Sequence, residues 1–134
     1  MLDEFVNNEG FYVKVQKLHE HYTNYRKTRR DGSCFYRALT FSIFEAIYIK
    51  KDKALKERVL KKLKEAKPFL IKAGFEGMVF EDMLELLLEK LDDPKITKID
   101  QIMDLFCDAS LSNYIILVMR FLTSGELKNN SVLY

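Results

Sequence analysis

Hydrophobic residues recur at three- and four-residue spacing along most of the chain, which is the pattern of amphipathic helices. The spacing predicts one helix over residues 11–22 and a second helix that begins at or beside Cys34. Between them, residues 25–28 are predicted to be a short extended segment. Residues 29–33 contain adjacent Asp and Gly, which favour turn conformations, so we expect a loop that leads into the second helix.

The same periodicity predicts two helices in the middle of the chain. Residues 55–73 form the first, with Gly74 placed where a C-terminal cap would lie. Pro68 is expected to kink or divide this helix, because proline cannot donate a backbone hydrogen bond. Residues 80–91 form the other helix, and the sequence Asp92-Asp93-Pro94 stops it.

Short polar residues predict where the later helices begin. Thr97, with an acidic residue three positions on at Asp100, resembles a capping box for a helix that runs through Phe106. Either Ser110 or Ser112 is predicted to cap the helix after it.

The last part of the chain contains two further signals. Residues 123–125 end in glycine and are predicted to close the last long helix. Residues 129–131 resemble the cap of one more helix, for which residues 132–134 are too few, so we expect the chain to stop inside a domain. With no repeat and no linker-like stretch, the sequence predicts a single, mainly helical folding unit with little strand.

Composition and charge reduce the number of functional classes to be considered. The 48% hydrophobic content suffices for a core, and 22 basic residues against 20 acidic ones give a net charge of +2. A broad nucleic-acid surface is therefore not expected. Charge is local instead: residues 50–67 are basic and residues 76–104 acidic, and we expect the two segments to attract each other or, alternatively, to bind a partner.

The sequence also predicts the cellular compartment of the protein. Its longest apolar run, residues 114–119, is far shorter than the roughly 20 residues of a bilayer-spanning helix, so no membrane contact is expected. Residues 1–5 lack the features of a secretory signal. We therefore expect a cytoplasmic location, with the nucleus as a further compartment, and no disulfide between the two cysteines.

Cys34 is the strongest candidate for chemistry. The free N–H groups and the dipole of a helix that begins there favour a thiolate, as do Lys27, Arg29, Arg30 and Arg37 if they lie near the sulfur. The turn before it can direct backbone N–H groups toward an acyl-transfer oxyanion. A buried packing role for Cys34 is the alternative. Cys107, in an apolar helix, is expected to be a packing residue.

A cysteine nucleophile needs a base, which is usually histidine. Only His19 and His21 exist, two positions apart on the first helix, so their side chains point in different directions. We expect both to be surface residues. Neither cysteine has a second cysteine or histidine at ligand spacing, so no metal site and no cofactor are predicted.

Residues 25–38 resemble the active-site segment of the otubains, cysteine proteases of the OTU superfamily that remove ubiquitin. The resemblance extends in the same order over roughly residues 11–134. The other segments that carry it are Lys17-Leu18-His19, Gly74-Phe75, Phe80-Glu81-Asp82, Ser112-Asn113-Tyr114 and Arg120-Phe121-Leu122-Thr123-Ser124-Gly125.

This resemblance implies an α+β OTU cysteine-protease fold, of which residues 1–134 are the N-terminal part of a single domain. It identifies Cys34 as the nucleophile that attacks the carbonyl of the C-terminal glycine of ubiquitin. Asp31 belongs to the oxyanion loop and shapes it rather than acting as the base, while the backbone amides of Gly32 and Ser33 stabilise the oxyanion. Ser33 departs from the asparagine usual in otubains, which implies slower turnover.

Otubains carry their catalytic histidine near the end of a longer domain, so we expect the 134 residues alone to have little or no activity. The implied partners are ubiquitin and polyubiquitin. A different class of function stays open: a catalytically incomplete module that binds ubiquitin or ubiquitin-conjugating enzymes, because otubains also restrain those enzymes without cleavage.

Overall fold

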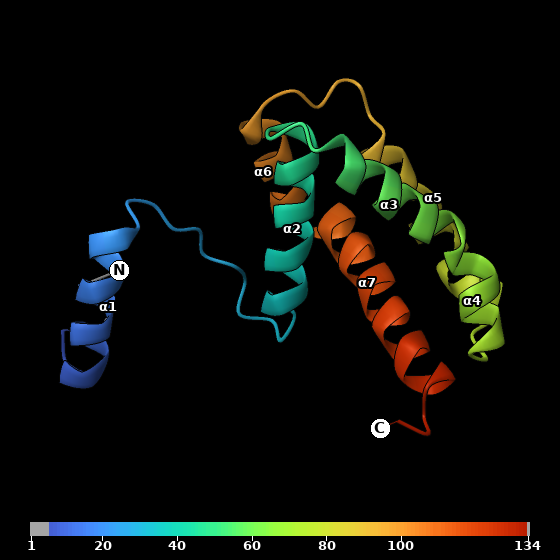
Figure 1. Ribbon diagram of the computed structural model, residues 1–134, viewed down its shortest axis with the longest axis horizontal. Coiled ribbons are helices and arrows are strands. Elements are labelled where there is room, and N and C mark those ends of the chain that lie inside the picture. Colours follow the sequence, from blue (N-terminus) through green and yellow to red (C-terminus); the bar gives the residue numbers. More distant parts are fainter. Residues whose placement is uncertain (1–5, 134) are drawn as a thin grey trace.

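A computed structural model of the chain describes residues 6–133, which form helices joined by short connections (Figure 1). No strand occurs in this range. The prediction of a mainly helical chain is confirmed, whereas the α+β character implied by the resemblance is not shown in this part. Residues 1–5, which bear on the secretory signal, lie outside the described residues. The helices are α1 (Glu9–His21), α2 (Cys34–Tyr48), α3 (Lys53–Lys64), α4 (Ala66–Lys72), α5 (Gly77–Leu91), α6 (Ile99–Cys107) and α7 (Ala109–Asn129).

Helix α7 is the centre of the packing. It contacts α2, α4, α5 and α6, and Figure 1 shows it running between α2 on one side and the α3–α5 group on the other. Helix α1 lies apart from this group and is joined to α2 by residues 22–33 (Figure 1). Residues 25–28 in this connection are neither helix nor strand.

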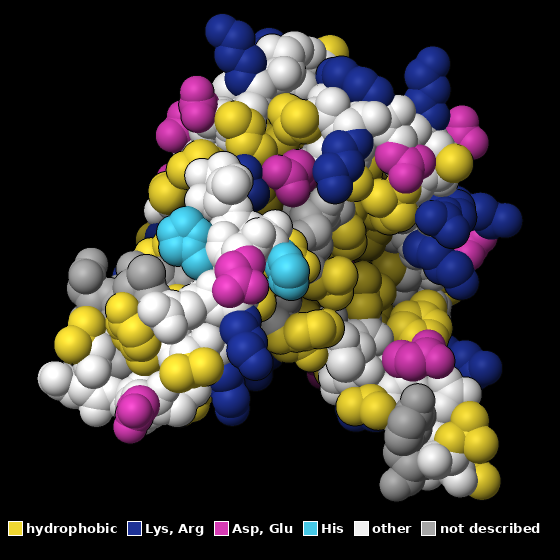
Figure 2. Space-filling model, turned by 60° about the vertical axis from the view of Figure 1, so that its left-hand side comes forward, with side chains coloured by type: hydrophobic (Ala, Val, Ile, Leu, Met, Phe, Trp, Pro, Cys, Tyr) yellow, Lys and Arg dark blue, Asp and Glu magenta, His cyan; other side chains and the backbone are white. Residues whose placement is uncertain are grey.

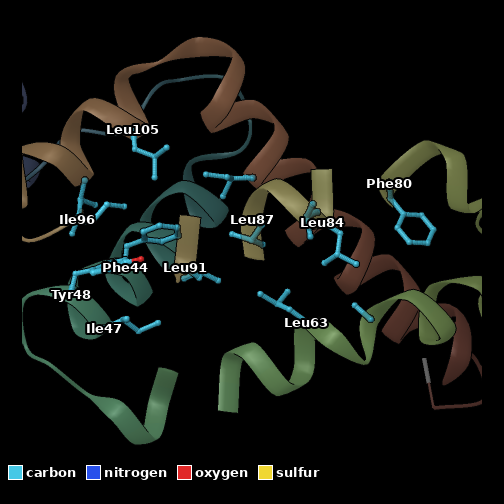
Figure 3. Packing of buried hydrophobic residues seen from close by; sticks show 14 of the residues in the cluster. Phe44, Ile47, Tyr48, Leu63, Phe80, Leu84, Leu87, Leu91, Ile96 and Leu105 are labelled. Carbon is cyan, nitrogen blue, oxygen red and sulfur yellow. The ribbon is translucent and has the colours of Figure 1, made fainter. Parts of the chain in front are cut away.

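The core lies between helices α2 to α7, and each of these six contributes apolar side chains to it (Figure 3). The most fully buried side chains include Phe44 of α2, Phe80 of α5 and Ile115 of α7. Three- and four-residue spacing places each stripe on one helix face, as the periodicity predicts. The buried cluster comprises Phe44, Ile47, Tyr48, Leu63, Ala66, Leu70, Phe80, Leu84, Leu87, Leu91, Ile96, Ile102, Leu105, Ile115 and Val118.

Tyr48 ties the end of α2 to the end of α5. Its hydroxyl donates to the carbonyl of Lys90 at 2.6 Å and accepts from the backbone N–H of Asp93 at 3.0 Å. Burial raises the pKa of Tyr48 to about 12. The phenol therefore stays neutral, and both of these backbone groups have a partner where α5 stops.

The predicted helix over residues 55–73 is divided, but not at Pro68 itself. Helix α3 ends at Lys64 and α4 begins at Ala66, with Pro68 in the first turn of α4. In a continuous helix Pro68 would have no N–H to donate to the carbonyl of Lys64, and its ring would collide with that carbonyl. The break therefore falls just before the proline, where the missing N–H leaves no helical hydrogen bond unmade.

Two predicted helix caps are wrong. Helix α6 is not capped by Thr97 and Asp100; the side-chain oxygen of Gln101 accepts the backbone N–H groups of Thr97 and Lys98 instead. Helix α7 is capped neither by Ser110 nor by Ser112. A neighbouring carboxylate, that of Asp108, accepts the N–H of Leu111 at 2.8 Å and takes this role.

Residues 123–125 do not end the last long helix either, because α7 continues to Asn129. Gly125 is buried against α4: a Cβ atom there would lie 2.9 Å from side-chain atoms of Phe69 and Leu70. Glycine is present for this close helix approach rather than as a C-terminal cap. Residues 129–131 likewise close α7, with Asn130 at its C-terminal cap, and do not begin another helix.

The basic and acidic segments attract each other as predicted. Lys56 of α3 pairs with Asp92 at 2.6 Å, and Lys67 of α4 pairs with Glu81 of α5 at 3.1 Å. The pair from Lys56 lowers the pKa of Asp92. Because these side chains are largely exposed, each pair adds little to stability.

Among the described residues, none of the helices taken singly has the length and apolar character to cross a bilayer. Helices α6 and α7 meet that test only when taken together, and they are bent by 88° at their junction.

We expect Gly125→Leu to lower the free energy of unfolding by about 1–3 kcal/mol, because the new side chain must displace Phe69 and Leu70 from a packed contact. Urea unfolding followed by circular dichroism measures this change. Thr123→Leu, at an exposed position of the same helix, is the matched control and should change little. An equally small effect of both substitutions would contradict the close approach of α7 and α4.

Candidate active site

Cys34 is the first residue of α2 and is exposed. The predicted helix start is therefore confirmed, and the alternative of a buried packing residue is wrong. The N–H groups of Cys34, Phe35 and Tyr36 have no acceptor within the described part of the chain, as expected for the first turn of a helix. These donors and the positive end of the helix dipole favour an anion beside the sulfur.

The loop before Cys34 is shaped by Asp31. One carboxylate oxygen of Asp31 accepts the backbone N–H of Ser33 at 3.1 Å, and Gly32 between them has a φ of 76° that other residues rarely adopt. The expectation that both Gly32 and Ser33 offer their amides to an oxyanion is therefore corrected for Ser33. The N–H of Ser33 is engaged by Asp31, and those of Gly32 and Cys34 are the amides of this stretch without an acceptor in the described residues.

The other carboxylate oxygen of Asp31 binds Arg37, one helical turn beyond Cys34. Nε and Nη2 of Arg37 donate to it at 2.9 Å and 2.5 Å. The same guanidinium donates to Ser112 Oγ at 3.2 Å and to Asn113 Oδ1 at 2.7 Å, both on α7. With 5% of its surface exposed, Arg37 is a buried cation whose charge is matched by an acid and two polar oxygens.

These contacts determine the protonation state of Asp31 in the loop. The hydrogen bonds from Arg37 and from the Ser33 amide hold the pKa of Asp31 below its ordinary value of 3.8. Asp31 is therefore ionised at neutral pH, and its two oxygens accept hydrogen bonds from the loop and from α2. Its predicted part in shaping the loop agrees with this geometry.

The Arg37 network is the part of the site that sequence reasoning missed. The sequence suggested Arg37 only as a cation near the thiol, and its guanidinium is instead directed into the contact with α7. One signal was present: Arg37 lies in phase with Thr40, Phe44 and Ile47 on the buried face of α2. A cation in an apolar stripe implies buried partners.

A second arginine holds the outer side of the loop. Nη2 of Arg29 donates to the carbonyl of Cys107 at 2.6 Å, where α6 ends. Cys107 is exposed there, so its prediction as a packing residue is wrong. Further along the connection, Arg26 pairs with Glu45 at 3.3 Å and lies over the ring of Phe41. Residues 25–29 are thereby held against α2 and α6, and a cavity of about 540 Å³ lies between them.

The two histidines lie on α1, where both are exposed, as predicted. Figure 2 shows them at the surface of the molecule. Figure 1 places α1, which carries both histidines, apart from α2, which begins at Cys34. Within the described residues, no group of three or more histidine, cysteine, aspartate or glutamate side chains is arranged to hold a metal ion.

The lowered pKa of Asp31 predicts a pH-dependent contribution to stability. Since the folded state favours the ionised carboxyl, this contribution is present above the unfolded pKa and is lost as the pH falls through the lower folded pKa. We expect Asp31→Asn to lower the melting temperature at pH 7, and the gap to wild type to shrink steadily below about pH 4. Thermal unfolding between pH 3 and pH 7 measures it.

The control for that titration is Asp82→Asn, which changes an exposed acid on α5. Its gap to wild type should not follow the same pH course. A difference between Asp31→Asn and wild type that stays constant from pH 7 to pH 3 would show that the Arg37 contact does not depend on the carboxylate charge.

The amino-acid sequence of this chain is similar to sequences of known proteins. The chain is 33% identical over 130 residues to ubiquitin thioesterase OTUB1 of Homo sapiens, an alignment that covers 96% of the chain and 47% of that protein. It is 31% identical over 134 residues to ubiquitin thioesterase OTUB2 of Homo sapiens, covering 98% and 56%. It is also 32% identical over 123 residues to the OVARIAN TUMOR DOMAIN-containing deubiquitinating enzyme 1 of Arabidopsis thaliana, covering 88% and 40%.

The chain thus spans about half the length of the curated relatives it matches. The family model of Peptidase C65 Otubain matches residues 1–134, which is the whole of the sequence. The resemblance found in the motifs is therefore confirmed, and this chain belongs to the otubain family of C65 peptidases.

Proposed function

We propose that this chain is the nucleophile-bearing part of a deubiquitinase, in which the Cys34 thiolate attacks the C-terminal carbonyl of ubiquitin in an isopeptide bond. The observation that carries the proposal is the exposed position of Cys34 as the first residue of α2, after a loop fixed by Asp31. The family membership and the names of the relatives, which are ubiquitin thioesterases, support the same reaction.

In the proposed reaction, the sulfur of Cys34 forms a bond to the carbonyl carbon, and the carbonyl oxygen takes up the negative charge. We assign the stabilisation of that oxygen to the amides of Gly32 and Cys34, which have no acceptor among the described residues, together with the helix dipole of α2. Collapse of the adduct breaks the bond to the lysine nitrogen, which leaves as an amine after gaining a proton. Water then hydrolyses the thioester and releases ubiquitin.

We assign residues 1–134 to the N-terminal part of one OTU domain. The base that takes the thiol proton and returns it to the amine would come from a histidine outside this sequence, because both of its own histidines lie on α1. The proposed partners are ubiquitin and polyubiquitin. A cytoplasmic location, extending to the nucleus, is part of the same proposal.

A second function is favoured by the position of those histidines. A chain whose histidines lie apart from its nucleophile can bind without turning over, so the alternative is a module that binds ubiquitin or a ubiquitin-conjugating enzyme. The two functions differ in whether Cys34 is needed.

The enzyme proposal predicts that a ubiquitin bearing a C-terminal alkyne labels this chain at one cysteine. The thiol adds across the triple bond, so that sulfur bonds to carbon, the proton passes to the neighbouring carbon and nothing leaves. Intact mass and peptide mapping should place the adduct on Cys34. Cys34→Ala should abolish labelling, and Cys107→Ala is the matched control that should retain it, because Cys107 is the other exposed thiol. Labelling at Cys107, or at neither residue, would contradict the proposal.

A second prediction separates labelling from turnover. Without a histidine base, we expect di-ubiquitin cleavage by the 134-residue chain to be on the order of 10²–10⁴-fold slower than by an otubain that contains the base, assayed alongside it. Ubiquitin binding that survives Cys34→Ala, without any labelling of the wild-type chain, would favour the binding module. Cleavage at the rate of the intact relative would show that a base is present within residues 1–134.

A further inference from the structure

The corner between α6 and α7 contacts the chain on both sides of Cys34, at Arg29 in the loop before it and at Arg37 on α2. On the outer side, the Cys107 carbonyl accepts from Arg29. On the inner side, Ser112 and Asn113 accept from Arg37. Residues 107–113 therefore bind both ends of the segment 29–37, which contains Cys34 near its middle.

Arg37 is the stronger of these two connections because its guanidinium is buried. A buried cation requires good partners, and the planar fork of arginine fixes their directions as well as their distances. Asp31, Ser112 and Asn113 supply acceptors to three different nitrogens of the fork. A shift of Asp31 relative to α7 would break at least one of these bonds.

The position of Asp31 in turn sets the amides at the thiol. Asp31 fixes the N–H of Ser33, while the carbonyl of Ser33 accepts the N–H of Arg37 at 3.0 Å. Because a peptide unit is planar and trans, this carbonyl and the N–H of Cys34 point in opposite directions. The N–H of Cys34 therefore points out of the N-terminal end of α2, where it has no acceptor among the described residues.

From this chain of contacts we infer that Arg37 is a positioning residue, which acts through Asp31 to hold the oxyanion-binding amides in the orientation set by the α6–α7 corner. This inference rests on the proposed function of Cys34. It adds that packing of α7, rather than the loop sequence alone, determines how well a tetrahedral adduct is stabilised.

The test uses ubiquitin aldehyde, whose carbonyl carbon forms a bond to the Cys34 sulfur while the proton of the thiol passes to the oxygen. This adduct forms reversibly, so its affinity measures stabilisation at the oxygen without requiring turnover. The affinity of ordinary ubiquitin and the rate of Cys34 alkylation by iodoacetamide are measured alongside, because neither of them creates a tetrahedral adduct whose oxygen the amides would bind.

For Arg37→Met we expect the affinity for ubiquitin aldehyde to fall by about tenfold to a hundredfold. Ubiquitin binding and the alkylation rate should stay unchanged. Arg37→Lys should recover only part of the loss, because a lysine ammonium restores the charge but not the fork. Arg120→Met is the matched control: it removes an exposed arginine from α7 and should behave as wild type.

Asn113→Ala is a second variant that tests the same contact, for the case in which the Arg37 variants do not fold. Asn113 is exposed, so the substitution is expected to leave the fold intact while removing one acceptor of the guanidinium. It should weaken the aldehyde adduct in the same direction as Arg37→Met, with a smaller loss of melting temperature than that variant, because Asp31 and Ser112 still bind the guanidinium.

The outcomes separate the two proposals. If wild type binds ubiquitin aldehyde and folded Arg37→Met and Asn113→Ala bind it equally well, Arg37 is merely structural and this inference is overturned, while the proposed function stands. If wild-type Cys34 forms no adduct with ubiquitin aldehyde, the proposed function fails, and there is no oxyanion for Arg37 to position.

Discussion

The buried guanidinium of Arg37 is the contact on which the arrangement around Cys34 depends. It joins three parts of the chain that are distant in sequence or local structure: the loop at Asp31, the first turns of α2, and the start of α7. A cation with 5% of its surface exposed is tolerated only when its donors are matched. The loop before the thiol is therefore coupled to the packing of the whole helical group.

Because of that coupling, the position of α7 affects the loop at Cys34, the proposed nucleophile. Asp108 caps the helix, and the carbonyl of the same residue accepts the hydroxyl of Ser112 at 2.6 Å. The hydroxyl that meets Arg37 is thus itself oriented by the cap. Further along α7, Gly125 allows the close approach to α4 that fixes where the helix lies. The packing of α7 therefore fixes where Ser112 and Asn113 bind Arg37, and Arg37 in turn binds the loop at Asp31.

The sequence predicted the helices well because their signal is repeated many times: each apolar stripe contains several residues at helical spacing, so one ambiguous position does not change the result. Predictions of helix ends that rested on a single residue were less accurate. Thr97, Ser110 and Gly125 are each ordinary markers of helix ends, but a neighbouring Gln101 or Asp108 captured the free N–H groups, and Gly125 was retained for packing. The Arg37 network joins residues about 75 positions apart, which local patterns do not reveal.

The same network supports the proposal that Asp31 shapes the loop without acting as the base. One oxygen accepts the Ser33 amide and the other accepts two donors of Arg37, so three of the roughly four acceptor positions of the carboxylate are occupied. These bonds also lower the pKa of Asp31, which makes the carboxylate a weaker proton acceptor. An acid beside a nucleophilic cysteine is easily interpreted as its general base. Here the hydrogen bonds hold Asp31 in the loop, so in the proposed reaction we assign the thiol proton to a different group.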